Sequence, residues 1–484
     1  MKRRAFLLST VITPAFGQKK VADPAPPKVT QQNGAALVAQ ANPDTTFRKK
    51  PGALNKSAVT EEWPCFLGST HNGHSKETKL IKKFPATGPQ LVWEMSKGTG
   101  YSSPSVSNGK LVFFHRKTAQ EVVECLHPET GERFWQHTYL TEFEDRYGYN
   151  NGPRASPIID GDRVYTMGDE GKLHCLHLPT GKVIWRRDLK QEFQLRQDFF
   201  GMASTPLLEG DQLIINVGAP GPTVAAFDKL TGKMNWGAGT EWGGSYASPI
   251  PATVHGQRRI FVFAGGESQP PTGGLIMLDP ASGAIDFSFP WRSKSYESVN
   301  ASCPVIFGNS VFISASYKTG GAMLEITKDF KYKLAWTNPD FGMHFNTPIH
   351  KDGYLYAFDG RNEPDAALSC VDAKTGKVAW RTNPEWKESF TAGGQLREPL
   401  LSTYRGNLLH VDGRFLALGE LGHLLWMDLT PAGYKEGSRG WLFAARETWS
   451  LPVLSHGLLY VVQHTKESIN SKGPRLLCYN MRDS

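Results

Sequence analysis

The residues best suited to chemistry lie just ahead of eight regularly spaced prolines. Arg can pair with a carboxylate through two hydrogen bonds or stack on an aromatic ring, and aromatic residues together with Arg dominate the energetics of binding interfaces. These residue types therefore predict a binding surface, and no catalytic residue is predicted. The candidate binding residues are Tyr101, Arg154, Tyr246, Asn300, His344, Asn346, Arg397, Glu398 and Trp449.

Two simpler interpretations of these residues stay open. A ring-shaped fold must fill the mouth of its channel with polar side chains and water, so polar mouth residues do not require a function. Arg154 and Arg397 could each pair with a nearby acid, such as Asp145 or Glu398, and only hold their loops in place.

The sequence lacks the common catalytic and metal-binding patterns. It contains no Gly-x-Ser-x-Gly, no phosphate-binding loop and no dinucleotide fingerprint. The fourteen histidines show no His-x-x-x-His spacing, and His71 and His74 are interpreted as structural. The oxygen atoms of Glu398, Asn300 and Asn346 would suit Ca²⁺, but no spacing motif joins them, so no metal is predicted.

The eight prolines mark a repeat, because 43 to 55 residues separate each from the next. Between them, short apolar runs alternate with Gly-containing turns, as in residues 157–185, which is typical of strands joined by hairpins. Each unit therefore predicts four antiparallel strands. The prolines are Pro104, Pro157, Pro206, Pro249, Pro304, Pro348, Pro399 and Pro452.

Each unit ends on a bulky aromatic residue, and the count of these ends predicts a closed ring. Seven ends follow the eight prolines, and they are Trp135, Trp185, Trp236, Phe287, Trp336, Trp380 and Trp441. Trp93, which precedes the first proline, supplies the eighth end if its strand completes the unit that starts at Pro452. Closure removes the open sheet edge. We therefore predict an all-β, eight-bladed β-propeller of four-stranded antiparallel blades, closed by an N-terminal strand.

Four of the six cysteines, Cys125, Cys175, Cys370 and Cys478, occupy one slot of the third strand, which other units fill with residues such as Ala226 or Met277. A slot shared with such residues is a packing position, so these four are predicted to be buried free thiols. Cys65 and Cys303 remain as one conceivable disulfide.

The N-terminus predicts export. Residues 1–17 have a basic start, a short apolar stretch and small residues at Ala15 and Gly17, which is typical of a signal peptide. Arg3 and Arg4 resemble a twin-arginine motif, and an ordinary secretory signal is the alternative. Residues 18–60, rich in Pro, Gln and Lys, are expected to be a disordered linker, and residues 61–484 the propeller.

Charge and hydropathy argue against nucleic-acid binding and against a membrane span. The formal net charge of +8 divides into +3 for residues 1–17 and +5 for residues 18–60, which leaves a near-neutral ring. A nucleic-acid role would need a basic face, so none is expected. No run approaches the roughly 18 apolar residues of a membrane span.

The segments Asp228–Trp236 and Asp372–Trp380 both read Asp-x-x-Thr-Gly-Lys-x-x-Trp. This unit resembles the tryptophan-docking repeat of the quinoprotein alcohol dehydrogenase-like superfamily, and the segment Trp63–Gly68 resembles the start of exported bacterial PQQ-like repeat proteins. The resemblance implies that one tryptophan per blade wedges against the next blade. The implied set is Trp93, Trp135, Trp185, Trp236, Trp336, Trp380 and Trp441.

This superfamily contains both scaffolds, such as the propeller of the barrel-assembly machinery, and quinone enzymes. Many of the enzymes stack pyrroloquinoline quinone between a Trp and a disulfide of adjacent cysteines, above a Ca²⁺ ion, and this chain has no Cys-Cys pair. We therefore expect a periplasmic or envelope scaffold that is a monomer without cofactor and binds another envelope protein or a small ligand. The alternative is a quinone- and calcium-dependent alcohol or sugar dehydrogenase.

Overall fold

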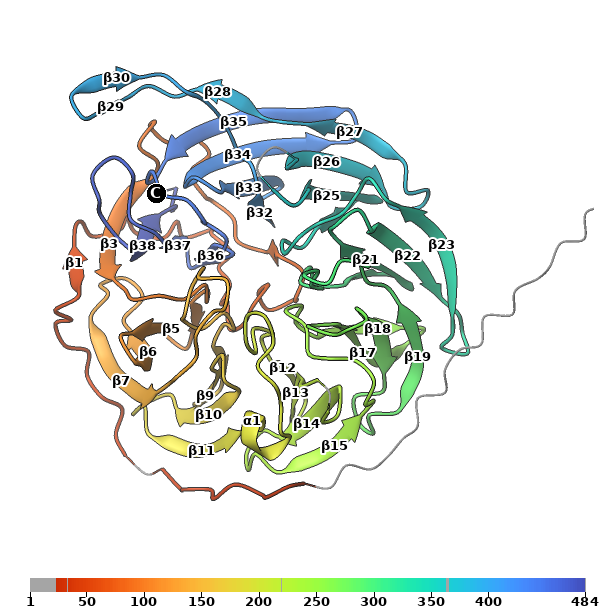
Figure 1. The fold of residues 1–484 in the computed structure, drawn as a ribbon. Coiled ribbons are helices and arrows are strands. Elements are labelled where there is room, and N and C mark those ends of the chain that lie inside the picture. Colours follow the sequence, from red (N-terminus) through yellow and green to blue (C-terminus); the bar gives the residue numbers. More distant parts are fainter. Residues whose placement is uncertain (1–22, 33, 219, 363–364, 484) are drawn as a thin grey trace, which may run out of the picture.

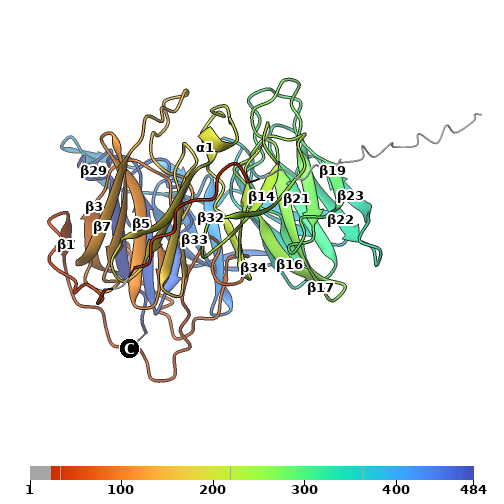
Figure 2. The same cartoon turned by 90° about the horizontal axis from the view of Figure 1, so that it is seen from below.

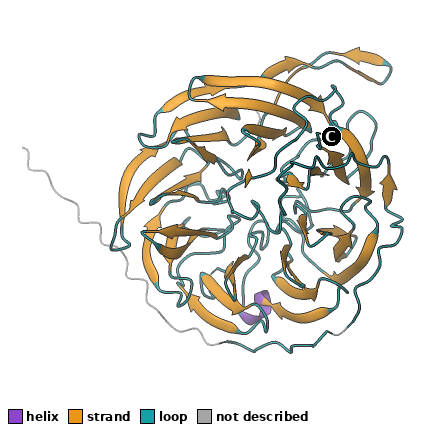
Figure 3. Cartoon of the chain, turned by 180° about the vertical axis from the view of Figure 1, so that it is seen from behind, coloured by secondary structure: helices purple, strands orange, loops and turns teal. Residues whose placement is uncertain are grey.

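The computed structural model describes residues 23–32, 34–218, 220–362 and 365–483, and it shows a ring of eight sheets around a central channel (Figure 1). Strands make up almost all of the regular structure (Figure 3). The described residues contain a single helix, α1 (Leu189–Glu192), which lies on one face of the ring with the C-terminus near the other (Figure 2). The predicted signal peptide lies outside the described residues. None of the described helices is long and apolar enough to span a membrane.

Each blade consists of four antiparallel strands, and the first strand lies nearest the channel. Blades 1 to 4 are formed by β4 (Ser105–Ser107), β5 (Lys110–Lys117), β6 (Gln120–Leu126) and β7 (Arg133–Leu140); β8 (Ile158–Asp160), β9 (Arg163–Met167), β10 (Lys172–His177) and β11 (Val183–Asp188); β12 (Leu207–Glu209), β13 (Gln212–Asn216), β14 (Val224–Asp228) and β15 (Met234–Ala238); and β16 (Ile250–Val254), β17 (Gln257–Ala264), β18 (Gly274–Leu278) and β19 (Ile285–Pro290).

The second half of the ring follows the same order. Blades 5 to 8 are formed by β20 (Val305–Phe307), β21 (Ser310–Ala315), β22 (Gly320–Ile326) and β23 (Tyr332–Asn338); β24 (Ile349–Lys351), β25 (Tyr354–Asp359), β26 (Ala367–Asp372) and β27 (Val378–Thr382); β32 (Gly406–Val411), β33 (Arg414–Gly419), β34 (His423–Thr430) and β35 (Gly433–Trp441); and β36 (Val453–Ser455), β37 (Leu458–Gln463), β38 (Arg475–Asn480) and β3 (Gln90–Ser96).

The N-terminal strand closes the ring, as the sequence predicts. β3 pairs antiparallel with β38 and places Trp93 opposite Cys478. In other blades a turn joins the third and fourth strands. In blade 8 these strands, β38 and β3, come from distant parts of the chain, and the Ile81 amide, ahead of β3, donates to the Met481 carbonyl after β38 at 2.8 Å. The eight-bladed propeller is therefore confirmed.

Indole groups join neighbouring blades near the outside of the ring. Six of the expected tryptophans donate their Nε1–H to a carbonyl of the next blade: Trp93 to Pro128 (2.9 Å), Trp135 to Leu178 (2.7 Å), Trp185 to Lys229 (3.1 Å), Trp236 to Pro280 (3.1 Å), Trp336 to Ala373 (2.9 Å) and Trp380 to Thr430 (2.7 Å). The turn glycine makes room for the ring, since a Cβ on Gly181 would lie 2.6 Å from the Trp135 ring.

The expectation for Trp441 is wrong, because its indole donates to Leu421 within its own blade at 2.9 Å. Trp426 on β34 makes the inter-blade contact instead and donates to the Ile81 carbonyl at 2.9 Å. Trp426 lies opposite Ser438 on β35. In most other blades the tryptophan lies on the fourth strand, opposite a smaller residue on the third. In blade 7 the tryptophan lies on the third strand and the small residue on the fourth, so the aromatic ring fills the same space from the other strand.

A second set of hydrogen bonds joins the blades beside the channel. In blades 2 to 6, the residue before the repeat proline carries a hydroxyl or thiol that accepts a hydrogen bond from the equivalent amide of the preceding blade. The pairs are Ser103 to Ser156 (3.3 Å), Ser156 to Thr205 (3.0 Å), Thr205 to Ser248 (3.0 Å), Ser248 to Cys303 (3.3 Å) and Cys303 to Thr347 (3.2 Å). We call this set the inner girdle.

Cys303 belongs to the inner girdle, and Cys65 is a separate buried thiol. The two do not form a disulfide, because all six cysteines are free and buried. The four cysteines assigned to the packing slot are each fully buried, as predicted.

Pro399 does not start blade 7. It lies in an inserted hairpin formed by β28 (Glu385–Lys387), β29 (Phe390–Ala392), β30 (Gln395–Arg397) and β31 (Leu400–Ser402), which projects outside the ring (Figure 1). Blade 7 begins at β32, which no proline precedes directly. The insertion carries its own proline at nearly the repeat spacing, so the sequence pattern pointed to the wrong strand.

The described residues between 23 and 60 run along the outer strands of blades 3, 2, 1 and 8 (Figure 1). Asp23 pairs with Arg187 at 2.7 Å, Thr30 donates to Ile184 at 2.8 Å, and β1 (Thr45–Phe47) pairs with β3. This arrangement differs from the expected disordered linker. Backbone hydrogen bonds to strand edges hold the segment, and these do not depend on the apolar side chains that it lacks.

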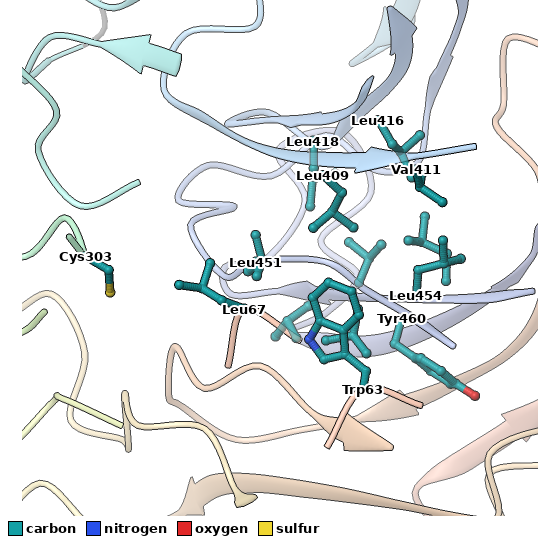
Figure 4. Packing of buried hydrophobic residues seen from close by; sticks show 14 of the residues in the cluster. Trp63, Leu67, Cys303, Leu409, Val411, Leu416, Leu418, Leu451, Leu454 and Tyr460 are labelled. Carbon is teal, nitrogen blue, oxygen red and sulfur yellow. The ribbon is translucent and has the colours of Figure 1, made fainter. Parts of the chain in front are cut away.

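The segment after residue 60 crosses the channel. Trp63 bridges to Val106 of blade 1, and β2 (His74–Ser75) pairs in parallel with β32 of blade 7. Figure 4 shows Trp63 and Leu67 among leucines of the last two blades, and Trp63 is 1% exposed. The motif that resembles the start of PQQ-like repeat proteins therefore fills the centre of the ring.

Trp185→Ala should lower the free energy of unfolding by about 3–5 kcal/mol, because it removes a fully buried ring and an inter-blade hydrogen bond. Trp441→Ala is the matched control, since the indole of this half-buried tryptophan donates within its own blade and its ring lies against His423 and Phe390. Urea unfolding followed by circular dichroism measures both changes. An equal loss for the two variants would contradict the role assigned to inter-blade packing.

Candidate functional site

A cavity of about 330 Å³ opens at the face where the loops between blades meet. Every loop that leads into a first strand contributes to it, and Phe66 and Leu67 of the channel-crossing segment form its floor. We call it the mouth cavity. Its aromatic residues are Tyr101, Tyr147, Tyr149, Phe200, Tyr246, Tyr317, Phe345 and Trp449, and its charged residues are Arg154, Arg361, Arg405 and Glu297.

The aromatic side chains form a connected wall. Trp449 lies at the centre, with ring centroids 5.2 Å from Tyr101, 5.5 Å from Phe345 and 6.1 Å from Tyr149. Phe200 continues the wall, 6.1 Å from Tyr149. Tyr149 remains 54% exposed, so this wall offers flat apolar surface that is reachable from solvent.

Arg154 lies at the mouth as predicted, but it is engaged by local acids. Its guanidinium donates to Asp145 at 2.8 Å and to Asp169 at 3.4 Å. Both carboxylates are buried, so Arg154 holds the loop from 143 to 154 in place. This is the simpler of the two interpretations of that residue.

Arg405 occupies the mouth position that the sequence assigned to Arg397. It donates to Glu420 at 2.9 Å and lies 4.9 Å from the Trp449 ring, whose indole also donates to Glu420 at 3.0 Å. Sequence reasoning missed Arg405 because no proline marks the start of β32. Arg397 and Glu398 are exposed in the inserted hairpin, away from the mouth cavity, and their predicted placement is wrong.

Arg361 and Tyr317 also line the mouth cavity, and the sequence did not predict them. Both come from hairpins inside a blade, and the guanidinium of Arg361 stacks over the Tyr317 ring at 4.1 Å. The repeat prolines mark only the loops between blades, so no sequence signal points to either residue.

His344 lines the mouth cavity as a neutral imidazole. Burial, assisted by Arg405 and Arg361, lowers its pKa to about 3. Its Nε2 lies 3.4 Å from the Tyr317 hydroxyl, and its Nδ1 has no hydrogen-bond partner among the described residues. A general base works best with a pKa near the working pH, so His344 is suited to hydrogen bonding and not to proton abstraction.

The two predicted tyrosines line the mouth cavity with their hydroxyls engaged. Tyr101 donates to Glu447 at 2.7 Å, and burial together with this carboxylate raises the pKa of Tyr101. Tyr246 accepts the Phe200 amide at 3.1 Å, and burial raises its pKa far above the usual value. Both therefore remain protonated phenols.

Asn300 and Asn346 support loops and do not line the cavity. The Asn300 amide donates to the carbonyls of Ala264 and Trp291, and the Asn346 amide donates to Phe358. Glu398, the third oxygen donor considered for Ca²⁺, lies in the inserted hairpin. Among the described residues, no three His, Cys, Asp or Glu side chains are placed to hold a metal ion. Glu398 is therefore not brought together with Asn300 and Asn346.

The loop that carries Tyr101 rests on a buried lysine. Lys97 donates to the carbonyls of Gly98 at 2.9 Å and Gly100 at 3.1 Å, and His464 Nδ1 approaches the Gly100 carbonyl at 2.8 Å. No acid neutralises Lys97 within 4.0 Å in the described part of the chain. Burial lowers the pKa of Lys97 to about 7.

Comparison with known proteins gives the family. The family model described as outer membrane protein assembly factor BamB matches residues 119–382, which is more than half of the chain. The chain belongs to this PQQ-like propeller family. Among curated protein sequences, none matches significantly.

Solved structures show the same fold in both scaffold and enzyme. BamB from Moraxella catarrhalis is 12% identical with a TM-score of 0.52, covering 82% of this chain and 99% of that one. A europium-containing methanol dehydrogenase is 11% identical with a TM-score of 0.59, covering 83% and 90%. Quinohemoprotein alcohol dehydrogenase from Comamonas testosteroni is 13% identical with a TM-score of 0.57, covering 88% and 81%. At these identities the likeness of these PQQ-like propellers extends to the fold alone.

Stability should rise with pH above 7 because of Lys97. Its pKa is about 7 in the folded chain and roughly 10.4 in an unfolded one, so between these values the unfolded chain binds the extra proton. The penalty of burying the ammonium is complete below pH 7 and fades as pH rises. Relative to Lys97→Met, the wild type should gain up to about 1.4 kcal/mol per pH unit between pH 7.5 and 8.5, measured by urea unfolding. Parallel pH profiles for the two proteins would refute this.

Proposed function

We propose that this chain is an exported, non-catalytic binding propeller of the cell envelope that takes its ligand at the mouth cavity. The observation that carries the proposal is the connected aromatic wall around Trp449 on a rigid ring. The charged groups nearby serve the architecture, since Arg154 and Arg405 are paired with buried acids. Such a surface supplies contact area and shape without a group poised for chemistry.

The wall favours a flat or ring-shaped apolar group as the part of the ligand that enters. A cavity of about 330 Å³ lies at the small end of the range for ligand pockets. The exposed rim residues Tyr147 and Tyr149 extend the contact beyond the cavity. Tyr and Trp are common anchors of protein interfaces, so a side chain that projects from another envelope protein fits this site, and a small ring-shaped molecule is the other candidate.

The leader and the family support the proposed location. We infer cleavage near Gly17, with the twin-arginine and general secretory routes both open, and a monomeric mature protein. The matched family is described as an outer membrane protein assembly factor, which supports an envelope location and a protein partner for this chain.

A quinone-dependent alcohol or sugar dehydrogenase is the second candidate. The flat Trp449 face and the neighbouring arginines favour a planar anionic cofactor. The position of Glu398 in the inserted hairpin weighs against it, and the six cysteines are free, with no two adjacent in sequence.

Photo-crosslinking in the native host tests the first candidate. A benzoylphenylalanine at Tyr149, which is 54% exposed at the mouth, should yield a discrete crosslinked product. The same residue at Leu334, which is 49% exposed on the outer strand β23, is the matched control and should yield none. Trp449→Ala should reduce the crosslink at least about tenfold, as expected for an interface anchor. Crosslinking only from Leu334 would contradict the proposal.

Reconstitution with pyrroloquinoline quinone and Ca²⁺ separates the two candidates. The binding proposal predicts no alcohol- or sugar-dependent reduction of a redox dye by the reconstituted protein. Micromolar quinone binding in calorimetry, together with substrate-dependent dye reduction, would replace the binding proposal with the dehydrogenase.

A further inference from the structure

A second cavity of about 730 Å³ lies beside the mouth cavity, over blades 2, 3 and 4. We call it the side cleft. Its lining includes Asp169, Asp198, Ser204 and Glu267, and a volume of this size falls within the range of small-molecule sites. The adjacent residues Arg146 and Tyr147 line the side cleft and the mouth cavity respectively, so the two sites share one wall.

The cations at this shared wall are already used. Arg146 forms an ion pair with Glu267, and the Tyr296 hydroxyl donates to the same carboxylate. Glu267 is therefore paired. Lys190 and Arg196 also line the side cleft, and Lys190 lies 3.9 Å from Glu170.

Asp198 presents an unpaired carboxylate oxygen. Its Oδ1 accepts the amides of Phe199 at 2.8 Å and Glu267 at 2.6 Å, which fixes the side chain. Its Oδ2 has no hydrogen bond from the described residues. Gly266 makes room for Oδ2, because a Cβ at that position would lie 1.7 Å away, and the φ of this glycine does not itself require glycine.

Two further polar atoms of the side cleft lack partners. Asp169 Oδ1 and Ser204 Oγ have no hydrogen bond among the described residues, although both residues are 2% exposed. A buried polar group without a partner is unfavourable, so these atoms are suited to a ligand that supplies the missing hydrogen bonds.

We propose that the side cleft binds a small amine that also carries hydroxyl groups, with the ammonium at Asp198 Oδ2 and a hydroxyl at Asp169 and Ser204. An ammonium offers three donors and a positive charge to a fixed carboxylate. A hydroxyl both donates and accepts, which suits the Asp169–Ser204 pair. A carboxylate ligand would meet the like charge of Asp198. The Arg292 guanidinium near Asp198 already donates to the carbonyls of Gly266, Thr272 and Ser298.

The protonation states agree with these roles. Burial raises the pKa of Asp198 to about 6, so this carboxylate is ionised at pH 7.5. Burial raises the pKa of Asp169 well above its usual value, and the charge of Arg154 opposes this shift. Asp198 is thus suited to an ion pair, and the unpartnered Oδ1 of the buried Asp169 is suited to a neutral hydroxyl.

Calorimetric titration of the full chain with three sugars tests the proposal, because they share one ring and differ at one substituent. Glucosamine carries the ammonium, whereas glucose and N-acetylglucosamine do not. We expect binding of glucosamine at pH 7.5 and no measurable binding of the other two. Absence of glucosamine binding, or equal binding of glucose, would overturn the proposal.

Matched variants locate the site. Asp198→Asn keeps the acceptor for the two amides and removes the charge, and it should weaken glucosamine binding at least about tenfold. Ser204→Ala should weaken it roughly two- to tenfold. Asp211→Asn, an 88% exposed carboxylate in the β12–β13 turn of blade 3, and Trp449→Ala in the mouth cavity should leave it unchanged. Loss in Trp449→Ala with binding retained in Asp198→Asn would place the site elsewhere and refute the proposal.

Discussion

Repeated contact between neighbouring blades is the interaction on which the structure depends. Beside the channel, the amide of one blade donates to the hydroxyl or thiol of the next, from Ser103 through to Thr347. Near the outside, an indole donates to a carbonyl of the following blade. A closed ring must pack blade against blade at every junction, and these two kinds of hydrogen bond recur at many of the junctions, so the same few residue types recur along the chain.

The contact also explains how the mouth cavity is built. Because the inner girdle fixes the start of the first strand in blades 1 to 6, the loops before these strands converge on one opening. Those loops then hold themselves in place through local pairs, such as Arg154 with Asp145 and Arg405 with Glu420. The aromatic wall around Trp449 therefore stands on a supported frame, which limits the entropy lost when a ligand binds.

The repeat made the fold predictable, and each error lies where a blade departs from it. The prolines, the Thr-Gly turns and the end aromatics report local geometry, so they predicted eight blades and closure by the strand around Trp93. Pro399 was wrongly assigned to the start of blade 7, because the inserted hairpin places a proline at nearly the repeat spacing. Trp441 was wrongly expected to contact the next blade, because Trp426 fills that space from the adjacent strand.

The site was predicted in part for the same reason. Tyr101, Arg154, Tyr246, His344 and Trp449 lie in loops between blades and line the mouth cavity. Arg361 and Tyr317 come from hairpins within blades, and only the three-dimensional arrangement brings them to the mouth. The segment from residue 23 to 60 is held by backbone hydrogen bonds to strand edges, and hydropathy does not report such bonds.

Hydrogen–deuterium exchange on the protein recovered from its native envelope, with bound material retained and then removed, tests the central claim most directly. The account predicts that bound material slows exchange in the mouth loops at residues 143–154, 196–203 and 344–347, while the outer strands and the hairpin at 385–402 are unchanged. Protection confined to that hairpin or to residues 23–60 would show that the working surface is the outside of the ring, and would contradict the account.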